Sequence, residues 1–459
     1  MTLKLPLLAL VVASCASAQY KSVNPTVKKI VDEVSEERIS EILKKLESFG
    51  TRNIFSEDDN PTRGVGAARR WIYDQFCSYS PRLQVRFDSY KVKKKGRIVR
   101  DVELHNVVAV LPGKTNPERQ FIVSAHYDSL ALIRPLQNNA EGASQPAADS
   151  QFELSNLAPT APGVSDDGSG TAAVLELARV MSKYEFEKTI VFVAFTAEEE
   201  GLIGASLYAR KARAENQIID GLLNNDIIGT EVSGNGRIDN GTLWVFSEDP
   251  DDSPSRELAR YVKEMSDRYF PSMRVDLVFR ADRFGRGGDH TAFNLEGFPA
   301  VRFTTPNESL ANQHTVTDTF ANASAPYTTR AVRSNAAALA SLALAPKAPV
   351  TNEPIKSGPR KGQPTPMIGR GKSRYDAALR WTNENPEADL LGYVVVVRKT
   401  TSPNWEREIF VGNVKEYTLK DVSIDDLVFG VKAVDRDGNE SLVAPYVASP
   451  RQKAEIDTY

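Results

Sequence analysis

The chain has 459 residues and a formal net charge of -3, with 41% hydrophobic and 25% charged residues. This composition is ordinary for a soluble globular protein, and so small a net charge gives no reason to expect nucleic acid or an anionic membrane as a partner. The length suggests about three domains, with enough residues to build a core that needs no disulfides.

The first residues, MTLKLPLLALVVASCASAQY, resemble a secretory signal: one lysine, a short apolar run and then small residues. The run is too short for a membrane span. Two processing sites remain open, because cleavage after Ala18 would remove residues 1–18, whereas VASC resembles a bacterial lipobox with Cys15 as the lipidated first residue. We predict an exported protein, secreted or periplasmic, or lipid-anchored to the outer cell surface or outer membrane. Only Cys77 remains beyond the signal, and we expect it to be a small buried residue.

Residues 25–48 carry apolar side chains at helical spacing. RGVGAARRWIYDQFCSY predicts a second helix, and residues 83–113 predict strands joined by a basic turn. From about residue 120, short β-branched runs alternate with helical patterns, ending in a helix rich in alanine and leucine near 345. Such alternation predicts an α/β domain over residues 19–345, with three αβα layers around a mostly parallel, mixed sheet. The polar stretch 131–162 predicts an inserted surface loop.

Residues 346–372 are rich in proline, glycine and lysine, which predicts a linker. Residues 373–459 hold short alternating strands without a helical period, which predicts a small all-β sandwich. With Trp381 in an early strand and FGVKAVDRDGNES near the end, this part resembles a fibronectin type III domain. It could contact a surface or polymer, act as a spacer, or only support the α/β domain.

Acids and histidines stand where the predicted strands end. They are His126 and Asp128, Glu198 and Glu199, Asp226, the pair Asp166 and Asp167 before a helix, and His314 and Asp318 after the last strand. The carboxyl ends of parallel strands are where α/β sheets build sites. Any one of these residues alone would more often be a structural histidine, a helix cap or a turn residue. Their joint placement predicts a functional site.

Imidazole and carboxylate groups suit zinc. Five ligands shared by two ions require one bridging carboxylate, and such a pair of ions can hold a bridging water or hydroxide. One further carboxylate is then needed as general base. In Glu198, Glu199 and Glu200, we predict that one residue binds metal, its neighbour moves protons, and the third points to solvent.

The motifs AHYDS, GVSDDGSG, AEEEG, NND, GGDHTAF and NQHTVTDT occur in this order over about residues 25–345. In these motifs the chain resembles the secreted two-zinc aminopeptidases, whose relatives include glutamate carboxypeptidase, the transferrin receptor ectodomain and the glutaminyl cyclases. The resemblance implies that Asp166 bridges two zinc ions, that His126 and Asp226 complete one site, and that Glu199 and His314 complete the other. It also implies that Glu198 is the general base.

By the same resemblance, Asp128 orients His126, a cis peptide joins Asp166 to Asp167, and Asp167 and Asp318 support the ligands. Asp289 and His290 belong to a DH element near the pocket wall. Members of this family often carry a tyrosine before that element to stabilise the oxyanion. Here the segment is FRADRFGRGGDH, so Arg283 or Arg286 is the candidate for that role, the alternative being pairing with surface acids.

We therefore predict an exported zinc exopeptidase, an aminopeptidase that hydrolyses N-terminal residues from peptides. Three alternatives stay open: a carboxypeptidase of the same family, a glutaminyl cyclase-like transferase with one zinc ion, and a non-catalytic binding protein.

Overall fold

The computed structural model describes residues 23–134, 152–358, 360–383 and 387–447. The predicted signal peptide, Cys15 and most of the polar stretch 131–162 lie outside these ranges. The described residues fold into two compact units: Pro25–Leu344, and the described residues from Ala345 onward together with Val23 and Asn24. No helix within the described ranges combines the length and apolar character that crossing a bilayer requires.

The first unit is built on one eight-stranded sheet with the order β1-β2-β4-β3-β5-β8-β6-β7. The strands are β1 (Gln84–Val92), β2 (Val102–Leu111), β3 (Asn116–His126), β4 (Lys188–Phe195), β5 (Ile218–Asn225), β6 (Thr242–Ser247), β7 (Arg274–Val278) and β8 (Ala300–Thr304). The pairs β4/β3, β3/β5, β5/β8 and β6/β7 are parallel, whereas β1/β2, β2/β4 and β8/β6 are antiparallel. The prediction of a mostly parallel, mixed sheet is confirmed.

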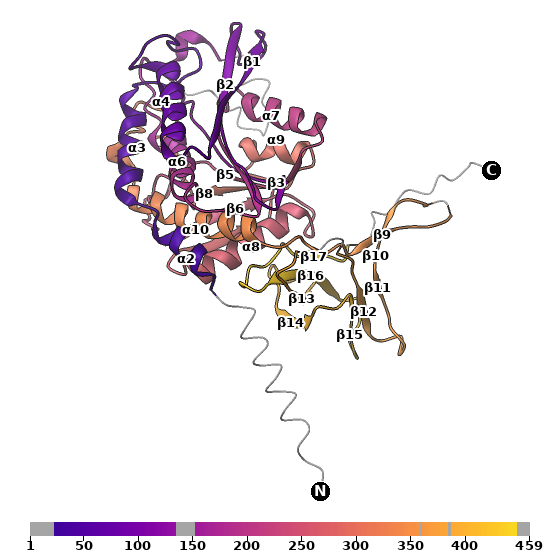
Figure 1. Cartoon of the computed structure of the whole chain (residues 1–459). Coiled ribbons are helices and arrows are strands. Elements are labelled where there is room, and N and C mark those ends of the chain that lie inside the picture. Colours follow the sequence, from indigo (N-terminus) through magenta and orange to yellow (C-terminus); the bar gives the residue numbers. More distant parts are fainter. Residues whose placement is uncertain (1–22, 135–151, 359, 384–386, 448–459) are drawn as a thin grey trace, which may run out of the picture. The chain divides into compact units, whose positions relative to one another are not determined.

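Helices cover both faces of this sheet (Figure 1). They are α2 (Pro25–Asp32), α3 (Glu36–Ser48), α4 (Gly64–Tyr79), α6 (Ser169–Met181), α7 (Ile203–Ala214), α8 (Pro254–Tyr269), α9 (Asp289–Leu295) and α10 (Ala325–Leu344), with short turns η1 (Leu154–Asn156), η2 (Val164–Gly168) and η3 (Phe320–Asn322). Helices α7 and α9 pack through Tyr208 and Phe293 onto a core that includes Ile122 and Val191. Helices α6 and α10 contact β3 and β4 from the other layer.

Two details of this unit differ from the sequence prediction. Residues 25–48 form two helices, α2 and α3, because the Ser35 side chain accepts a hydrogen bond from the Arg38 backbone and starts a new helix there. Cys77 is exposed, so the prediction of a buried thiol is wrong. The buried face of α4 runs through Val65, Ala68, Ile72 and Phe76, and Cys77 lies outside that helical stripe.

The second unit contains small antiparallel sheets. Its strands are β9 (Asn352–Pro354), β10 (Pro364–Pro366), β11 (Ile368–Gly369), β12 (Ala377–Arg380), β13 (Leu390–Lys399), β14 (Arg407–Gly412), β15 (Glu416–Leu419), β16 (Leu427–Asp435) and β17 (Ala444–Pro445). Sheets β11-β12-β15 and β14-β13-β16-β17 share a core in which Trp381 meets Tyr393 edge-on at 5.5 Å. Separate antiparallel sheets in this region agree with the predicted fold class.

The segment predicted as a linker, 346–372, carries regular structure. It holds β9, β10 and β11, and Met367 is buried in the core of the second unit. The Met367 backbone donates to Thr351, whose hydroxyl donates to the Pro445 carbonyl. Strands β9 and β10 pair with each other within the segment, and β11 pairs with β12 outside it. Composition did not predict these strands, because it carries no information on which residues pair.

Candidate metal centre

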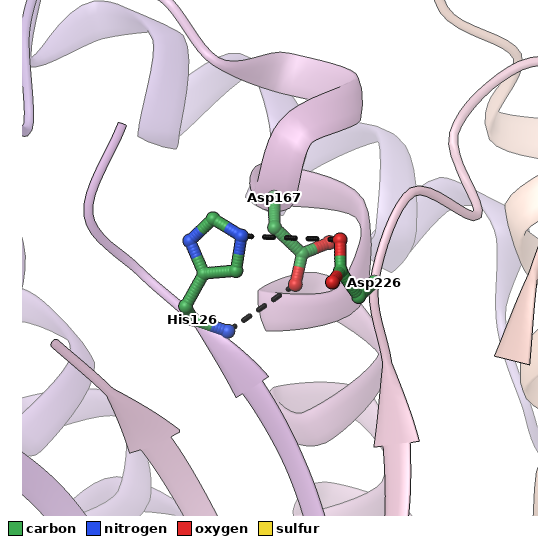
Figure 2. A group of neighbouring side chains, drawn as sticks. All are labelled: His126, Asp167 and Asp226. Atoms are coloured by element: carbon green, nitrogen blue, oxygen red, sulfur yellow. Dashed lines mark hydrogen bonds and ion pairs between the residues drawn. The ribbon is translucent and has the colours of Figure 1, made fainter. Parts of the chain in front are cut away.

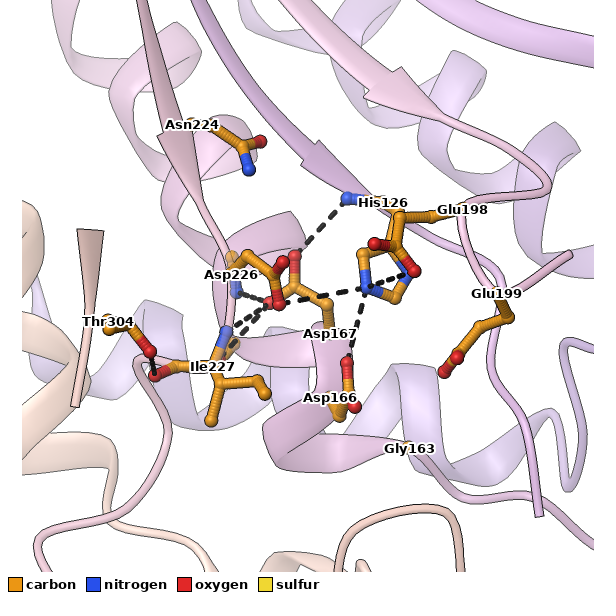
Figure 3. Close-up of polar contacts among 12 residues, drawn as sticks. His126, Gly163, Asp166, Asp167, Glu198, Glu199, Asn224, Asp226, Ile227 and Thr304 are labelled. Atoms are coloured by element: carbon orange, nitrogen blue, oxygen red, sulfur yellow. Dashed lines mark hydrogen bonds and ion pairs between the residues drawn. The ribbon is translucent and has the colours of Figure 1, made fainter. Parts of the chain in front are cut away.

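The ends of three adjacent strands bring the candidate ligands together. His126 is the last residue of β3, Asp226 directly follows β5, and Glu198 and Glu199 lie in the loop after β4. Since β3 pairs in parallel with both β4 and β5, these residues meet at one edge of the sheet (Figure 3). Asp166 enters from η2, ahead of α6.

Asp166 lies between two histidines. Its Oδ1 is 3.2 Å from His126 Nε2, and its Oδ2 is 3.2 Å from His314 Nε2. His126 Nε2 is 3.9 Å from Asp226 Oδ1, and His314 Nε2 is 3.0 Å from Glu199 Oε2. The five predicted ligands therefore form two adjoining groups that share Asp166.

Two groups of side chains share His126, and within each group the potential ligand atoms all lie within 4.8 Å of one another. One group is His126, Asp166 and Glu199, and the other is His126, Asp167 and Asp226. Figure 2 shows the second group. Asp167 is already occupied, because its carboxylate accepts from the backbone N–H of His126 (3.2 Å), Gly170 (2.9 Å) and Ile227 (3.3 Å). These contacts leave Asp166 freer than Asp167 to bind a metal ion, in agreement with the predicted roles of the two residues.

The residues fit a metal ion, because atoms that would bind it lack other partners. Within the described ranges, His126 Nε2 and Glu199 Oε1 are buried and have no hydrogen-bond partner. Leaving such atoms unsatisfied is costly unless a ligand completes them. Imidazole nitrogen and carboxylate oxygen are the donor types that zinc takes.

The electrostatics of the group reflect how many acids are buried together. Burial, together with the negative charges of Asp226 and Glu199, raises the pKa of Glu198 well above its usual range despite the opposing effect of His126. Burial also raises the pKa of Asp166, but the neighbouring imidazoles of His126 and His314 outweigh it and bring that pKa well below its usual value. Asp166 is thus the most firmly ionised member, as a carboxylate shared by two cations should be.

Asp128 connects the β3 and β4 loops beneath the ligands. Its carboxylate accepts from the backbone N–H of Glu198 at 3.4 Å and of Glu199 at 3.3 Å. His126 Nδ1 lies closer to the Asp128 carbonyl oxygen (3.2 Å) than to its carboxylate (3.6 Å). A donating Nδ1 leaves Nε2 as the lone-pair nitrogen that faces Asp166.

Asp318 holds the turn that carries Asp166. Its two oxygens accept from the backbone N–H of Ser165 (2.8 Å) and Asp166 (3.0 Å), and burial raises its pKa to about 6. Gln313 donates to Asp166 Oδ2 at 2.8 Å. The peptide bond between Asp166 and Asp167 is cis, as the resemblance implied.

The remaining candidates line the other side of the group. Arg283 pairs with Asp282 (2.9 Å) and Glu308 (2.6 Å), and Arg286 also pairs with Glu308. His290 is buried with Nε2 2.9 Å from the Ala281 carbonyl oxygen. Asp289 is buried at the start of α9, and neither of its carboxylate oxygens has a partner among the described residues.

Glu200 is 4% exposed, so the prediction that it points to solvent is wrong. The loop folds inward before α7 begins, and Asn53 Nδ2 is 3.5 Å from Glu200 Oε1. Burial and the charges of Asp128 and Glu199 raise the pKa of Glu200 well above its usual range. Sequence reasoning did not place the segment around Asn53 against this loop.

Sequence reasoning also missed two buried arginines. Arg302 Nε lies 3.2 Å from Asp226 Oδ2, and its NH1 lies 3.0 Å from Asp282 Oδ1. Arg52 donates to the carbonyl oxygens of Tyr127 (2.6 Å) and Gly163 (2.7 Å), and burial lowers its pKa to about 10. The mostly apolar neighbours of Arg302 in AVRFT were a usable signal, because an arginine in a core strand needs acidic partners.

The sequence pattern of peptidase family M28 matches residues 106–340. A probable zinc metalloprotease of Leptosphaeria maculans is 33% identical over 446 residues, covering 90% of this chain and 95% of the relative. The chain belongs to peptidase family M28. A second probable zinc metalloprotease of this kind, from Phaeosphaeria nodorum, is 34% identical over 450 residues, covering 90% of this chain and 86% of its own.

Two solved structures share the fold of this M28 chain. The LapA aminopeptidase of Legionella pneumophila has a TM-score of 0.51 and 21% identity, covering 70% of this chain and 76% of its own. The glutaminyl cyclase of Macrostomum lignano has a TM-score of 0.52 and 16% identity, covering 69% of this chain and 92% of its own. Membership of the M28 family makes the chain an enzyme, a zinc-dependent peptide-bond hydrolase.

Proposed function

We propose that this M28 peptidase is an exported aminopeptidase that holds two zinc ions. The observation that carries the proposal is the position of Asp166, whose two carboxylate oxygens each face a different histidine at 3.2 Å. His126 and Asp226 would complete one metal position, and Glu199 and His314 the other. When bound, zinc supplies Lewis acidity and lowers the pKa of water.

In this proposal Glu198 is the general base. Its Oε2 lies 3.9 Å from His126 Nε2, and its side chain is 13% exposed, so it borders the metal ligands and still faces the opening. Glu198 would take a proton from the attacking water as the water oxygen bonds to the scissile carbonyl carbon. It would then return that proton to the departing amine as the C–N bond breaks.

The first test is zinc content together with a substrate panel. Zinc per chain would be measured in the purified protein, before and after zinc is supplied. The same preparation would be assayed on peptides with free or acetylated N-termini, on C-terminally amidated peptides, and on N-terminal glutamine substrates that report cyclisation.

Two zinc ions and cleavage that requires a free N-terminal amine would support the proposal. Cleavage that instead requires a free C-terminus would make the protein a carboxypeptidase. One tightly held zinc with cyclisation of glutamine would favour the cyclase alternative, for which the fold shared with the Macrostomum lignano cyclase is the observation. A protein that binds no zinc after supplementation would contradict an enzyme of this mechanism.

Export and the role of the second unit complete the proposal. The mature N-terminus distinguishes the two processing sites: a chain beginning at Gln19 indicates a signal peptide, and a lipidated Cys15 indicates an anchor.

The two-sheet arrangement of the second unit, three strands facing four, supports its likeness to a fibronectin type III domain. A role in attachment or spacing predicts that a chain ending at residue 345 loses surface binding or solubility, and unchanged behaviour would contradict it.

A further inference from the structure

The hairpin formed by β1 and β2 ends in a strongly basic segment. Residues 91–103 hold six lysines and arginines and only two acids, in a chain whose net charge is -3. We call residues 93–100 the basic tip. The tip closes in a two-residue turn, in which Lys95 and Ile98 exchange backbone hydrogen bonds of 2.9 and 3.0 Å. Gly96 takes the positive φ of 57° that such a turn requires, so the basic residues are held on a defined backbone.

The basic tip lies on the side of the sheet where the metal ligands meet. Strand β2 runs antiparallel to β4 with Val107 opposite Ala194, so residues 102–105 continue past Phe195, the last residue of β4. At about 3.4 Å per residue they extend about 13 Å beyond this end. Figure 1 shows β1 and β2 extending past the other strands. The loop that carries the proposed general base follows the same end of β4.

Two contacts fix the basic tip to that loop. Arg97 NH1 donates to the carbonyl oxygen of Glu199 at 3.0 Å. Ile98 is 1% exposed and belongs to an apolar cluster with Ala197, two residues before Glu199. A peptide that extends from the metal centre over β4 towards β2 therefore meets the basic tip.

Two consecutive lysines of the basic tip keep their charges available. The Lys93 side chain pairs with Asp101 at 2.6 Å, whereas Lys94 contacts the same carboxylate only through its backbone N–H, at 3.0 Å. Lys94 and Lys95 are exposed, and within the described ranges neither ammonium group forms an ion pair. The tip thus presents two adjacent positive charges to solvent beside the site.

The acids of the adjoining loop leave these charges unpaired. Arg100 NH2 donates to the Phe55 carbonyl oxygen at 2.8 Å, which brings the acidic residues 57–59 near the hairpin. Asp58 pairs with Arg69 at 2.6 Å. Among the described residues, none of the three acids forms an ion pair with a lysine of the basic tip. An anion that reaches Lys94 and Lys95 therefore has no ion-paired acid to displace.

The basic tip suits a small anion better than a membrane surface. No large apolar side chain of residues 91–103 is exposed, so none is available to enter a bilayer. Three of the six basic residues, Lys93, Arg97 and Arg100, are already bound within the protein. The remaining three are fewer than the roughly 4–8 that membrane-binding basic clusters carry. One or two ammonium groups are enough to bind a carboxylate.

We propose that Lys94 and Lys95 in the basic tip bind carboxylates of the peptide downstream of the scissile bond, so that the enzyme favours acidic peptides. This inference rests on the proposed aminopeptidase function and names its substrate class. An exposed ion pair changes affinity by up to about fivefold, so the two lysines together should change it by about tenfold. The carboxylate can belong to an acidic side chain or to the C-terminus of a short peptide.

The test compares kcat/KM for peptides that share a free N-terminal leucine and an amidated C-terminus. They differ at the third to fifth residues, which are all glutamate, all glutamine or all lysine. We expect the glutamate peptide to exceed the glutamine peptide by about tenfold and the lysine peptide to be the poorest. About 0.5 M NaCl should remove most of the difference, because salt screens exposed charges. Leucinamide is too short to reach the tip and gives the reference activity.

A double variant, Lys94→Gln with Lys95→Gln, should bring the glutamate-to-glutamine ratio close to one and leave the turnover of leucinamide unchanged. Lys94→Glu with Lys95→Glu should reverse the ratio. The matched control is Lys28→Gln with Lys29→Gln, which removes two consecutive lysines of α2 whose side chains are 47% and 67% exposed. The control should keep the ratio of the unaltered enzyme.

A second peptide set with free C-termini identifies the source of the carboxylate. A gain for glutamate in the amidated peptides supports binding of acidic side chains. A gain confined to peptides with a free C-terminus, and lost in Lys94→Gln with Lys95→Gln, supports binding of the terminal carboxylate.

A binding measurement separates this inference from the proposed function. Fluorescence anisotropy would follow labelled glutamate and glutamine peptides, each with a reduced and therefore uncleavable first peptide bond, on the zinc-supplied protein. Tighter binding of the glutamate peptide that the lysine variant loses, without turnover of any peptide, would leave the tip assignment standing and contradict the aminopeptidase proposal.

Three results would overturn the inference and leave the proposed function standing. The first is cleavage of free-amine peptides with no difference between glutamate and glutamine. The second is an unchanged glutamate-to-glutamine ratio in Lys94→Gln with Lys95→Gln. The third is binding to phosphatidylserine vesicles that this variant loses, without any preference among peptides, because the basic tip would then bind a membrane surface.

Discussion

Buried charged side chains occur in both units, but their partners differ. In the second unit Lys432 is 1% exposed and pairs with Glu440 and with Glu408. In the first unit, Asp289 is fully buried and both of its oxygens lack a partner among the described residues. Glu199 Oε1 is also buried and has no hydrogen-bond partner among the described residues.

This difference distinguishes buried charges that stabilise the fold from buried acids that are available to bind a ligand. A charge that serves the fold comes with its counter-charge, because burying it alone would cost several kcal/mol. A cluster of acids left incomplete in the same chain indicates that something outside the polypeptide completes it. Altering one member of each kind should therefore have different consequences.

The largest effect is expected for Glu198→Gln. This variant keeps the shape of the side chain but cannot accept a proton, so kcat should fall by about 10³-fold. Zinc content should not change, because Glu198 is not assigned as a ligand. Activity close to that of the unaltered enzyme would contradict the assignment of the base, and a loss of zinc would make Glu198 a ligand instead.

Glu440→Gln tests the paired charges of the second unit. Lys432 would lose a buried partner, and the unit should lose about 3 kcal/mol of unfolding free energy. Glu200→Gln is the matched change in the first unit, where Glu200 Oε2 has no described partner, and it should not lower stability. Native-state hydrogen exchange would measure the unfolding free energy of each unit separately. Equal losses of unfolding free energy in Glu440→Gln and Glu200→Gln would contradict the difference between paired and unpaired buried charges.

Arg302→Met should weaken metal binding. Asp226 and Asp282 would lose the guanidinium that holds them at 3.2 and 3.0 Å, and support of this kind is worth about 10–100-fold in metal affinity. Competition with a zinc chelator would measure the change. Arg256→Met is the control, because Arg256 is also buried in this unit but pairs with Asp249, away from the ligands.

The smallest effect is expected for Gly288→Ala. Gly288 has an extended backbone, so the change acts through the new Cβ, which would lie 2.9 Å from Asp226 Oδ2. Displacing this ligand slightly should lower kcat/KM about tenfold. In Gly287→Ala the nearest atom, Thr291 Oγ1, is 3.3 Å away, and activity should change less. If kcat/KM falls equally in both variants, contact of the new Cβ with Asp226 does not explain the loss of activity.

The sequence alone was sufficient for the order of strands and helices in the first unit and for the side chains that meet at their ends. Short β-branched runs and helical spacing are local signals, and parallel strands carry the residue after each run to one edge of the sheet. His126, Asp226 and Glu199 could therefore be expected at one site before the distances between them were known, and their roles as ligands were implied by the family resemblance of the motifs.

Only the tertiary structure decided where Glu200, Arg302 and the basic tip lie. Glu200 looked like a solvent-facing residue at a helix start, but the chain near Asn53 covers it. Arg302 was missed in the sequence, and in the folded chain it meets Asp282, 20 residues earlier, at 3.0 Å. Arg97 in the basic tip meets the carbonyl oxygen of Glu199, 102 residues later in the chain. Contacts between distant segments leave no periodic trace in a sequence, so burial, charge pairing and the position of the tip emerge only when the chain is folded.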